Sequence, residues 1–239
     1  MTDASLAATL LVGFLLGLRH ALDADHVAAV AAIVSGRDGV RRSVLTGVFW
    51  GLGHALTIGG VGLVLLALRA TVPPRLALFF EFAVAVVLMI LGGVALAGVL
   101  RGRVHAHRHE HDGVPHAHLH FHAAPHGDDA AHRHPHPLRA MVRPFLVGTL
   151  HGLAGSGALV LLVLATVPTL LLGCLYLGIF GAGSIAGMAL MSLALAAPLV
   201  LAQRRVLWLY RALRGAAGLG SLGLGLLLAW RIGRAGLFH

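Results

Sequence analysis

Residues Leu76–Leu100 read LALFFEFAVAVVLMILGGVALAGVL, an apolar run that carries a single charge, Glu81. At about 1.5 Å per residue in a helix, a run of this length crosses the roughly 30 Å hydrocarbon core of a bilayer. The apolar residues are continuous rather than alternating, which favours a helix over a strand of a membrane barrel. The stretch therefore predicts a transmembrane helix and an all-α membrane protein.

The composition of the whole chain agrees with that class. Its 239 residues are 58% apolar and 11% charged, with a mean hydropathy of +0.87. Soluble globular domains are about 25% charged, so this chain has too few charges to cover a surface that faces water. The formal net charge of +9 comes from arginine without lysine, and the arginines lie at the ends of apolar runs, as membrane anchors do. We therefore expect a lipid bilayer around the protein and no nucleic-acid partner.

Similar apolar runs predict six transmembrane helices in all. Their expected ranges are Leu6–Val34, Val44–Leu68, Leu76–Leu100, Val142–Val167, Leu170–Ala202 and Val206–Trp230. A hydrophilic insertion, Arg101–Arg143, separates the third run from the fourth. The chain thus divides into a three-helix unit at 1–100, a His-rich hydrophilic loop at 101–141 and a second three-helix unit at 142–239.

The arginines also predict the orientation. Thirteen lie in or beside the first, third and fifth connectors, and four lie on the opposite side of the bundle. Cytoplasmic loops carry the excess of positive charge. We expect a multi-pass protein of the cytoplasmic (inner or plasma) membrane, with the N- and C-termini outside and the His-rich loop in the cytoplasm.

The two three-helix units resemble each other at an offset of 131 residues. Gly17-Leu-Arg-His20-Ala-Leu22 aligns with Gly148-Thr-Leu-His151-Gly-Leu153, and Gly47-Val-Phe49 aligns with Gly178-Ile-Phe180. Because each unit has an odd number of spans, the second must lie upside down relative to the first. Inverted repeats place a substrate site near the middle of the membrane, between the repeats.

Ionisable side chains gather in the first two predicted spans. A charged side chain at the centre of a membrane helix costs about 2.5–3.5 kcal/mol on insertion scales, so such residues usually face a cavity or a partner. Imidazole suits nickel, cobalt, copper and zinc, and carboxylates compensate the charge of the ion. We expect a midplane metal site, with one further histidine contributed by the facing repeat. The expected ligands are His20, Asp23, Asp25, His26 and His54, together with His151 from the second half.

The spacing of these residues leaves the local backbone open. On a continuous helix His20, Asp23 and His26 share one broad stripe, whereas Asp25 points to nearly the opposite side. Either Asp25 serves another helix or the span is unwound here, as transporter sites often are. The structural alternative to a metal site is that these side chains only pair with one another and with Arg19.

The insertion holds twelve of the seventeen histidines. Alternating histidines with acidic neighbours bind divalent metals loosely, and the segment cannot form a packed core, so we expect it to be disordered without metal. A role as a spacer is the alternative. The expected auxiliary metal-binding residues are His105, His107, His109, His111, His116, His118, His120 and His122.

With its His20-Ala-Leu-Asp23-Ala-Asp25-His26 motif, the chain resembles the nickel/cobalt transporter (NiCoT) family, whose signature is His, four residues, Asp, His. Phe49–Thr57, with Gly53-His54, is similar to that family's second motif, and Gly148–Leu153 resembles related nickel/cobalt permeases. The resemblance implies nickel or cobalt as substrate and implies His20, Asp25, His26 and His54 as pathway residues. Those uptake permeases usually have eight spans, and a long histidine tract is more typical of efflux or urease-accessory-like relatives.

These observations predict a secondary transporter of nickel or cobalt ions, with uptake as the expected direction and efflux as the alternative. Rivals of other classes are a membrane metalloenzyme, which would need an open coordination position and a general base, and a metal chaperone or sensor without transport. We expect no enzymatic activity and no permanent cofactor, only the transported Ni²⁺ or Co²⁺. The expected partners are the ion, the bilayer and metal-enzyme maturation proteins. The role of Glu81 stays open.

Overall fold

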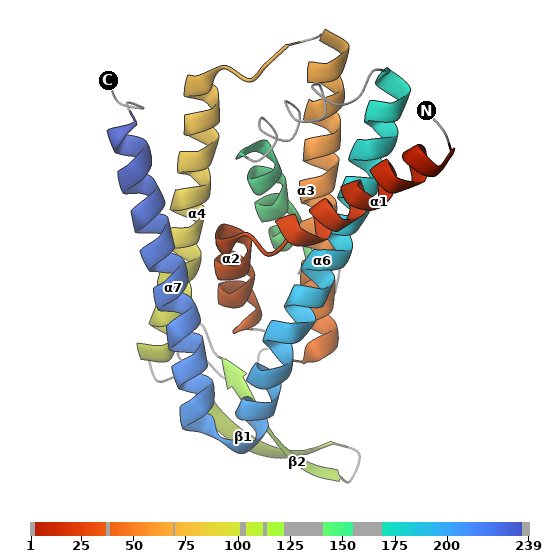
Figure 1. Ribbon diagram of the computed structural model, residues 1–239. Coiled ribbons are helices and arrows are strands. Elements are labelled where there is room, and N and C mark those ends of the chain that lie inside the picture. The colour runs from red at the N-terminus through yellow and green to blue at the C-terminus, as the bar shows by residue number, and fades with distance from the viewer. Residues whose placement is uncertain are drawn as a thin grey trace.

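The computed structural model describes residues 3–36, 39–68, 70–100, 104–111, 114–121, 141–154 and 169–235. The helices are α1 (Asp3–His20), α2 (Ala24–Val34), α3 (Val40–Leu68), α4 (Pro74–Leu100), α6 (Leu170–Arg205) and α7 (Leu207–Arg234). Residues 141–154 are also helical, and β1 (Val104–His111) pairs with β2 (Val114–Phe121) in an antiparallel hairpin. The helices form a bundle with the hairpin at one end, and α1 begins and α7 ends toward the other end (Figure 1).

Four helices, α3, α4, α6 and α7, are each long and apolar enough to cross a membrane. The pair α1 and α2 adds one more span if it is counted as a broken helix, because the two meet at a bend of 55°. The part of the chain that the structure describes thus contains four or five candidate spans, where the sequence predicted six. The expected fourth span, Val142–Val167, is helical at 141–154, and its remainder lies outside the described residues. The protein is an α-helical, multi-pass membrane protein.

The expected first span, Leu6–Val34, is not one continuous helix. It stops at His20, and α2 begins after Asp23, whose extended backbone (φ −60°, ψ 145°) occupies the N-cap position. Short backbone hydrogen bonds replace the helical ladder in between, from Leu22 N to Arg19 O at 2.9 Å and from Asp23 N to His20 O at 3.1 Å. Of the two possibilities that the spacing left open, the interrupted span is the one observed.

The helices associate in two groups. In the first group α6 packs against both α1 and α3, and the helix at 141–154 packs on α3 through Gly53 and Gly148. In the second group α4 packs along α7, and α2 packs mainly against these two. Gly17 shows why small residues lie in the contacts, because a Cβ there would overlap the backbone of Phe180 on α6. Backbones that approach this closely are typical of helix packing in lipid.

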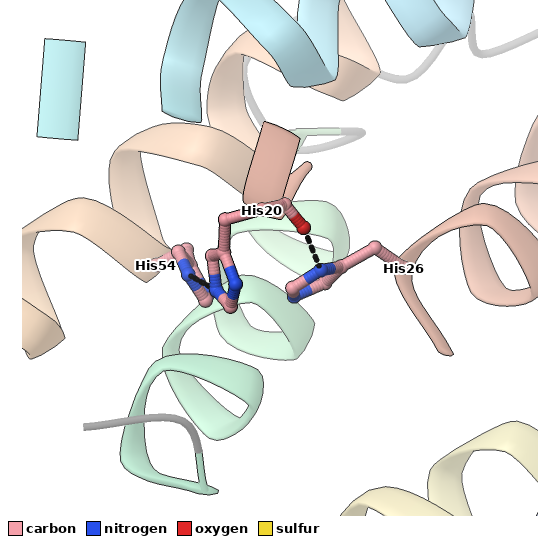
Figure 2. A group of neighbouring side chains, drawn as sticks. All are labelled: His20, His26 and His54. Carbon is pink, nitrogen blue, oxygen red and sulfur yellow. Dashed lines mark hydrogen bonds between the residues drawn. The ribbon is translucent and has the colours of Figure 1, made fainter. Parts of the chain in front are cut away.

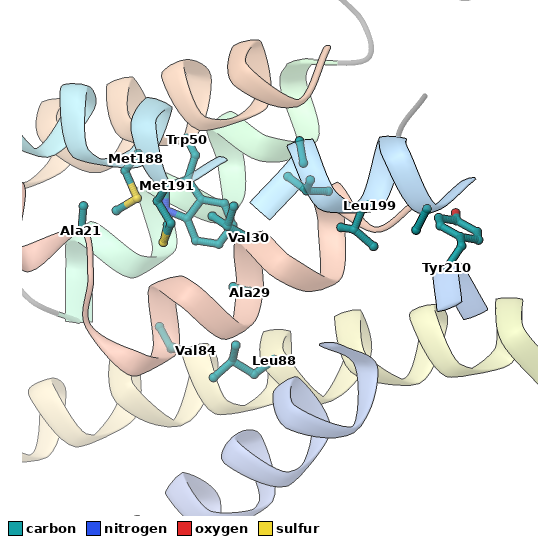
Figure 3. Close-up of a cluster of buried hydrophobic side chains, with 13 residues drawn as sticks. Ala21, Ala29, Val30, Trp50, Val84, Leu88, Met188, Met191, Leu199 and Tyr210 are labelled. Carbon is teal, nitrogen blue, oxygen red and sulfur yellow. The ribbon is translucent and has the colours of Figure 1, made fainter. Parts of the chain in front are cut away.

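Large apolar side chains cover the outside of the bundle, and polar ones lie inside. On α4, Phe79, Ile90 and Val94 are 56%, 59% and 65% exposed, whereas His54 and Ser221 are fully buried. A water-soluble bundle would have the opposite arrangement. The apolar core inside joins both groups of helices (Figure 3), and it includes Val30, Trp50, Leu88, Met188 and Tyr210.

Within the His-rich insertion the structure pairs two stretches in a hairpin, whereas the sequence predicted a segment without regular structure. In its register His105 is opposite His120, His107 is opposite His118, and His109 is opposite His116. A sequence that alternates with period two fits the geometry of a strand, which is a physical reason for the pairing. His122 and the residues that follow it up to 140 lie outside the described residues.

Two adjacent glycines on α4 provide a test of this packing. A Cβ on Gly92 would come within 2.5 Å of Leu222 N and 2.6 Å of Gly218 O on α7, whereas a Cβ on Gly93 would meet nothing within 4 Å. Gly92→Ala should therefore lower the free energy of unfolding by about 1–3 kcal/mol, the cost of overpacking. Gly93→Ala should keep or slightly raise stability because alanine is the better helix former. Thermal unfolding of the two purified variants in the same detergent checks this, and equal stability would contradict the packing.

Candidate metal centre

Three histidines from three helices meet at the break in the first span. His20 ends α1, His26 lies in the first turn of α2 and His54 lies in the middle of α3; their ligand atoms are all within 4.8 Å of one another (Figure 2). The Nε2 atoms of His20 and His54 are 3.0 Å apart. Two imidazole nitrogens bound to one metal ion at about 2.0–2.1 Å stand roughly 3 Å apart. This pair therefore already has the spacing of two ligands of one ion.

Hydrogen bonds at Nδ1 determine which nitrogen of each ring is available. His26 Nδ1–H donates to the backbone carbonyl of His20 at 2.9 Å, and His151 Nδ1–H donates to that of Val147 at 3.0 Å. His20 Nδ1 lies 2.8 Å from Oδ2 of Asp23, which accepts its hydrogen. In the neutral forms of these three rings Nε2 carries the lone pair, which is how histidine binds a metal ion.

Mutual hydrogen bonding does not satisfy the cluster. Because Nε2 of His20 carries a lone pair, Nε2 of His54 must donate in the 3.0 Å contact between them, which leaves Nδ1 of His54 as an acceptor. Among the described residues, Nε2 of His151 is buried without a hydrogen-bond partner, and Nδ1 of His54 is buried without a well-formed hydrogen bond, although the carbonyl of Gly148 lies beside its ring. A buried polar atom without a partner costs about 1–3 kcal/mol. The arrangement thus contains imidazole lone pairs that the protein itself does not use.

Carboxylates and helix ends give the surroundings a negative balance. Asp23 is 54% exposed beside His20, while Asp25 is partly buried in the first turn of α2, next to His26 in the chain. The C-terminal end of α1 carries partial negative charge and favours a cation. The N-terminal end of α2 carries the opposite partial charge, and the two carboxylates compensate for it. The field at the cluster therefore suits a positive ion.

The structure brings most of the predicted ligands together. His20, His26 and His54 form the cluster, and the ring of His151 lies beside that of His26, with centroids 5.4 Å apart. Asp23 and Asp25 flank it at the break. Glu81 lies apart, exposed on α4.

Sequence reasoning missed two aromatic neighbours of the site. The ring of Phe180 on α6 is 5.6 Å from that of His20, and the ring of Trp50 on α3 is 4.9 Å from that of His151. Both are buried and limit the space around the imidazoles. A signal was present, because Trp50 lies in the second motif and Phe180 lies in the repeated Gly-x-Phe element.

Comparison with known proteins gives two relatives. The chain is 30% identical over 206 residues to the urease accessory protein UreH of Bacillus sp. (strain TB-90), a match that covers 86% of this chain and 84% of that protein. It is 36% identical over 78 residues to the high-affinity nickel transport protein of Cupriavidus necator, covering 32% of this chain and 22% of that protein. No family model matches the chain, and no solved structure matches it.

The contact between Asp23 and His20 leads to a prediction about metal affinity. Asp23→Asn removes the charge that accepts the Nδ1 hydrogen of His20 and orients its ring, and loss of such a partner typically weakens metal binding by about 10–100-fold. Because Asp23 is 54% exposed, we expect a loss of affinity at the lower end of this range, about 10-fold for Ni²⁺. Titration calorimetry on the purified protein measures it, with Glu81→Gln as the matched control. Equal affinities for wild type and Asp23→Asn would refute this role of Asp23.

Proposed function

Because the chain belongs to the family of the urease accessory protein UreH, among the nickel-permease-like membrane proteins, we propose that it transports nickel across the membrane through the cluster of His20, His26 and His54. The observation that carries the proposal is this buried group of imidazoles from three helices. A naked divalent cation cannot enter a low-dielectric interior unless other ligands replace its lost water. Imidazole nitrogen is a suitable replacement for nickel.

The site offers a route for that exchange. Asp23, the exposed carboxylate, attracts the hydrated ion, and His20 and His54 take the place of its first lost waters. His26, with Asp25 beside it, completes the coordination, and His151 contributes from the facing half. Cobalt binds the same ligand types, so we propose nickel as the main substrate and cobalt as a second one.

The close contacts between helices support an inverted repeat. Gly92 of α4 packs on the backbone of α7, and Gly225 of α7 packs on the backbone of α4 in the same way. In this pair of helices the corresponding residues differ by 133 positions, two more than the offset of 131 found earlier in the two halves; the pairs are Ala85 and Gly218, Met89 and Leu222, and Gly92 and Gly225. A two-fold axis that exchanges two antiparallel helices lies perpendicular to both of them. Rotation about such an axis turns one half of the protein upside down relative to the other half. We propose that the two halves rock about this axis, as inverted-repeat transporters do.

The same proposal assigns the sides of the membrane. The hairpin end of the bundle is the cytoplasmic end, because Arg41, Arg42 and Arg211 lie near the ends of α3 and α7 that face it (Figure 1). The opposed histidines of β1 and β2 then receive the ion or buffer it in the cytoplasm. Nickel taken up in this way is passed to proteins that mature nickel enzymes, a role that agrees with the name of the UreH relative.

The first test is ion flux in proteoliposomes. His26→Ala and His54→Ala each remove one ligand and leave a buried gap, so we expect nickel flux to fall at least about 100-fold in both. Glu81→Gln, exposed on α4, should transport like wild type. Radiolabelled Ni²⁺ and Co²⁺ measure the flux. Unchanged flux in both histidine variants would instead favour a chaperone or sensor.

The direction of transport has its own measurement. Deletion of the gene in its host should lower cellular nickel several-fold if the protein imports the ion. Complementation with wild type should restore the nickel content, and complementation with His26→Ala should not. Elemental analysis of washed cells gives the result, and a higher nickel content in the deletion strain would mean efflux.

A further inference from the structure

The far end of α2, away from the histidines, is held by α7. Tyr210 Oη donates a hydrogen bond to the backbone carbonyl of Ser35 at 2.8 Å, and both residues are buried. Arg214 lies one turn further along α7, and its Nη1 donates to Tyr210 Oη at 3.5 Å. Its side chain is buried although it carries a charge. Buried charges in membrane helices are rare and usually have a function.

Two glycines make room for the guanidinium of Arg214 at this end of α2. A Cβ on Gly98 of α4 would overlap Nη2 of Arg214, and a Cβ on Gly36 would lie 3.8 Å from the same atom. The guanidinium is thus held between α4, α7 and the residues that follow α2. The C-terminal end of a helix carries partial negative charge, which a nearby cation stabilises. We call the hydrogen bond of Tyr210 to Ser35, together with the Arg214 guanidinium that donates to Tyr210, the α2 anchor.

The geometry of α2 explains why an anchor at one end matters at the other. The helix has 11 residues, and a helix this short is not stable by itself. It is roughly 16 Å long, so a tilt of about 5° at one end moves the other by about 1.4 Å. Metal–ligand bonds tolerate deviations of only about 0.2 Å. His26 lies in the first turn of α2, at the end opposite the anchor.

We infer that Tyr210 and Arg214 are positioning residues for the metal site, acting through α2 on His26, an inference that rests on the proposed function. The anchor fixes α2 to the group formed by α4 and α7. His20 and His54 belong to the other group, formed by α1, α3 and α6. The three histidines therefore come together only in one relative position of the two groups of helices. The anchor makes the position of His26 depend on the position of α4 and α7.

A double-mutant cycle tests the coupling to His26. Tyr210→Phe removes one hydrogen bond and should weaken nickel affinity about five-fold. Arg214→Gln should weaken it by a similar factor of about five. In a His26→Ala background each change should have less than about a two-fold effect, because the residue through which it acts is gone. Tyr176→Phe, a second buried tyrosine, is the matched control on α6. An unchanged affinity in Tyr210→Phe, or an equal loss in both backgrounds, would overturn the inference.

A readout that does not depend on nickel separates this inference from the proposed function. In a Cys174→Ser background, Ala32→Cys places a buried thiol on α2 and Ser192→Cys places one on α6. Adding Tyr210→Phe should raise the maleimide labelling rate at position 32 at least about five-fold and leave position 192 unchanged, because only α2 is released. No rise at position 32 overturns the anchor. If the wild type binds no nickel and Tyr210→Phe still raises the labelling rate at position 32, the proposed function is wrong and the anchor is retained.

Discussion

The interruption of the first membrane segment between His20 and Ala24 is the feature on which the histidine cluster depends, and it exists under a strict constraint. In a membrane every backbone N–H and C=O must find a partner within the protein. Short turns satisfy the N–H groups of Ala21, Leu22 and Asp23, and the imidazole of His26 donates to the carbonyl of His20. The side chain of His26 thus helps to close the break that positions it, so the local fold and the candidate site stabilise each other.

That constraint also explains how the protein tolerates polar groups in an apolar bundle. The break turns a helix C-terminus and a helix N-terminus toward one region, and Asp23 and Asp25 stand where the positive end would repel a cation. The second half supplies fewer ligands, because in the repeat alignment Ser156 and Gly157 stand where the first half has Asp25 and His26. In the proposed inverted repeat, the second half therefore contributes His151 alone, and the first half contributes the other candidate ligands.

Much of this could be predicted from the sequence, and the exceptions have physical reasons. Continuous apolar runs such as Leu76–Leu100 predict α4 closely, because lipid leaves few alternatives. The grouping of His20, His26 and His54 followed from their polarity inside such runs. Whether the first span is broken at Asp25 was left open, because no proline marks a break there. Contacts between distant helices, such as Tyr210 with Ser35, carry no local pattern at all.

The remaining question is whether these imidazoles only pair with one another. Pairing forces His54 to donate through Nε2 and leaves its Nδ1 buried without a well-formed bond, although the carbonyl of Gly148 lies against the ring. If an ion takes the lone pairs of both Nε2 atoms, the proton of His54 moves to Nδ1, where that carbonyl can accept it. His151 meanwhile offers an Nε2 that has no other partner among the described residues. Binding a cation therefore satisfies groups that pairing leaves unsatisfied, which favours a metal site over a self-contained histidine cluster.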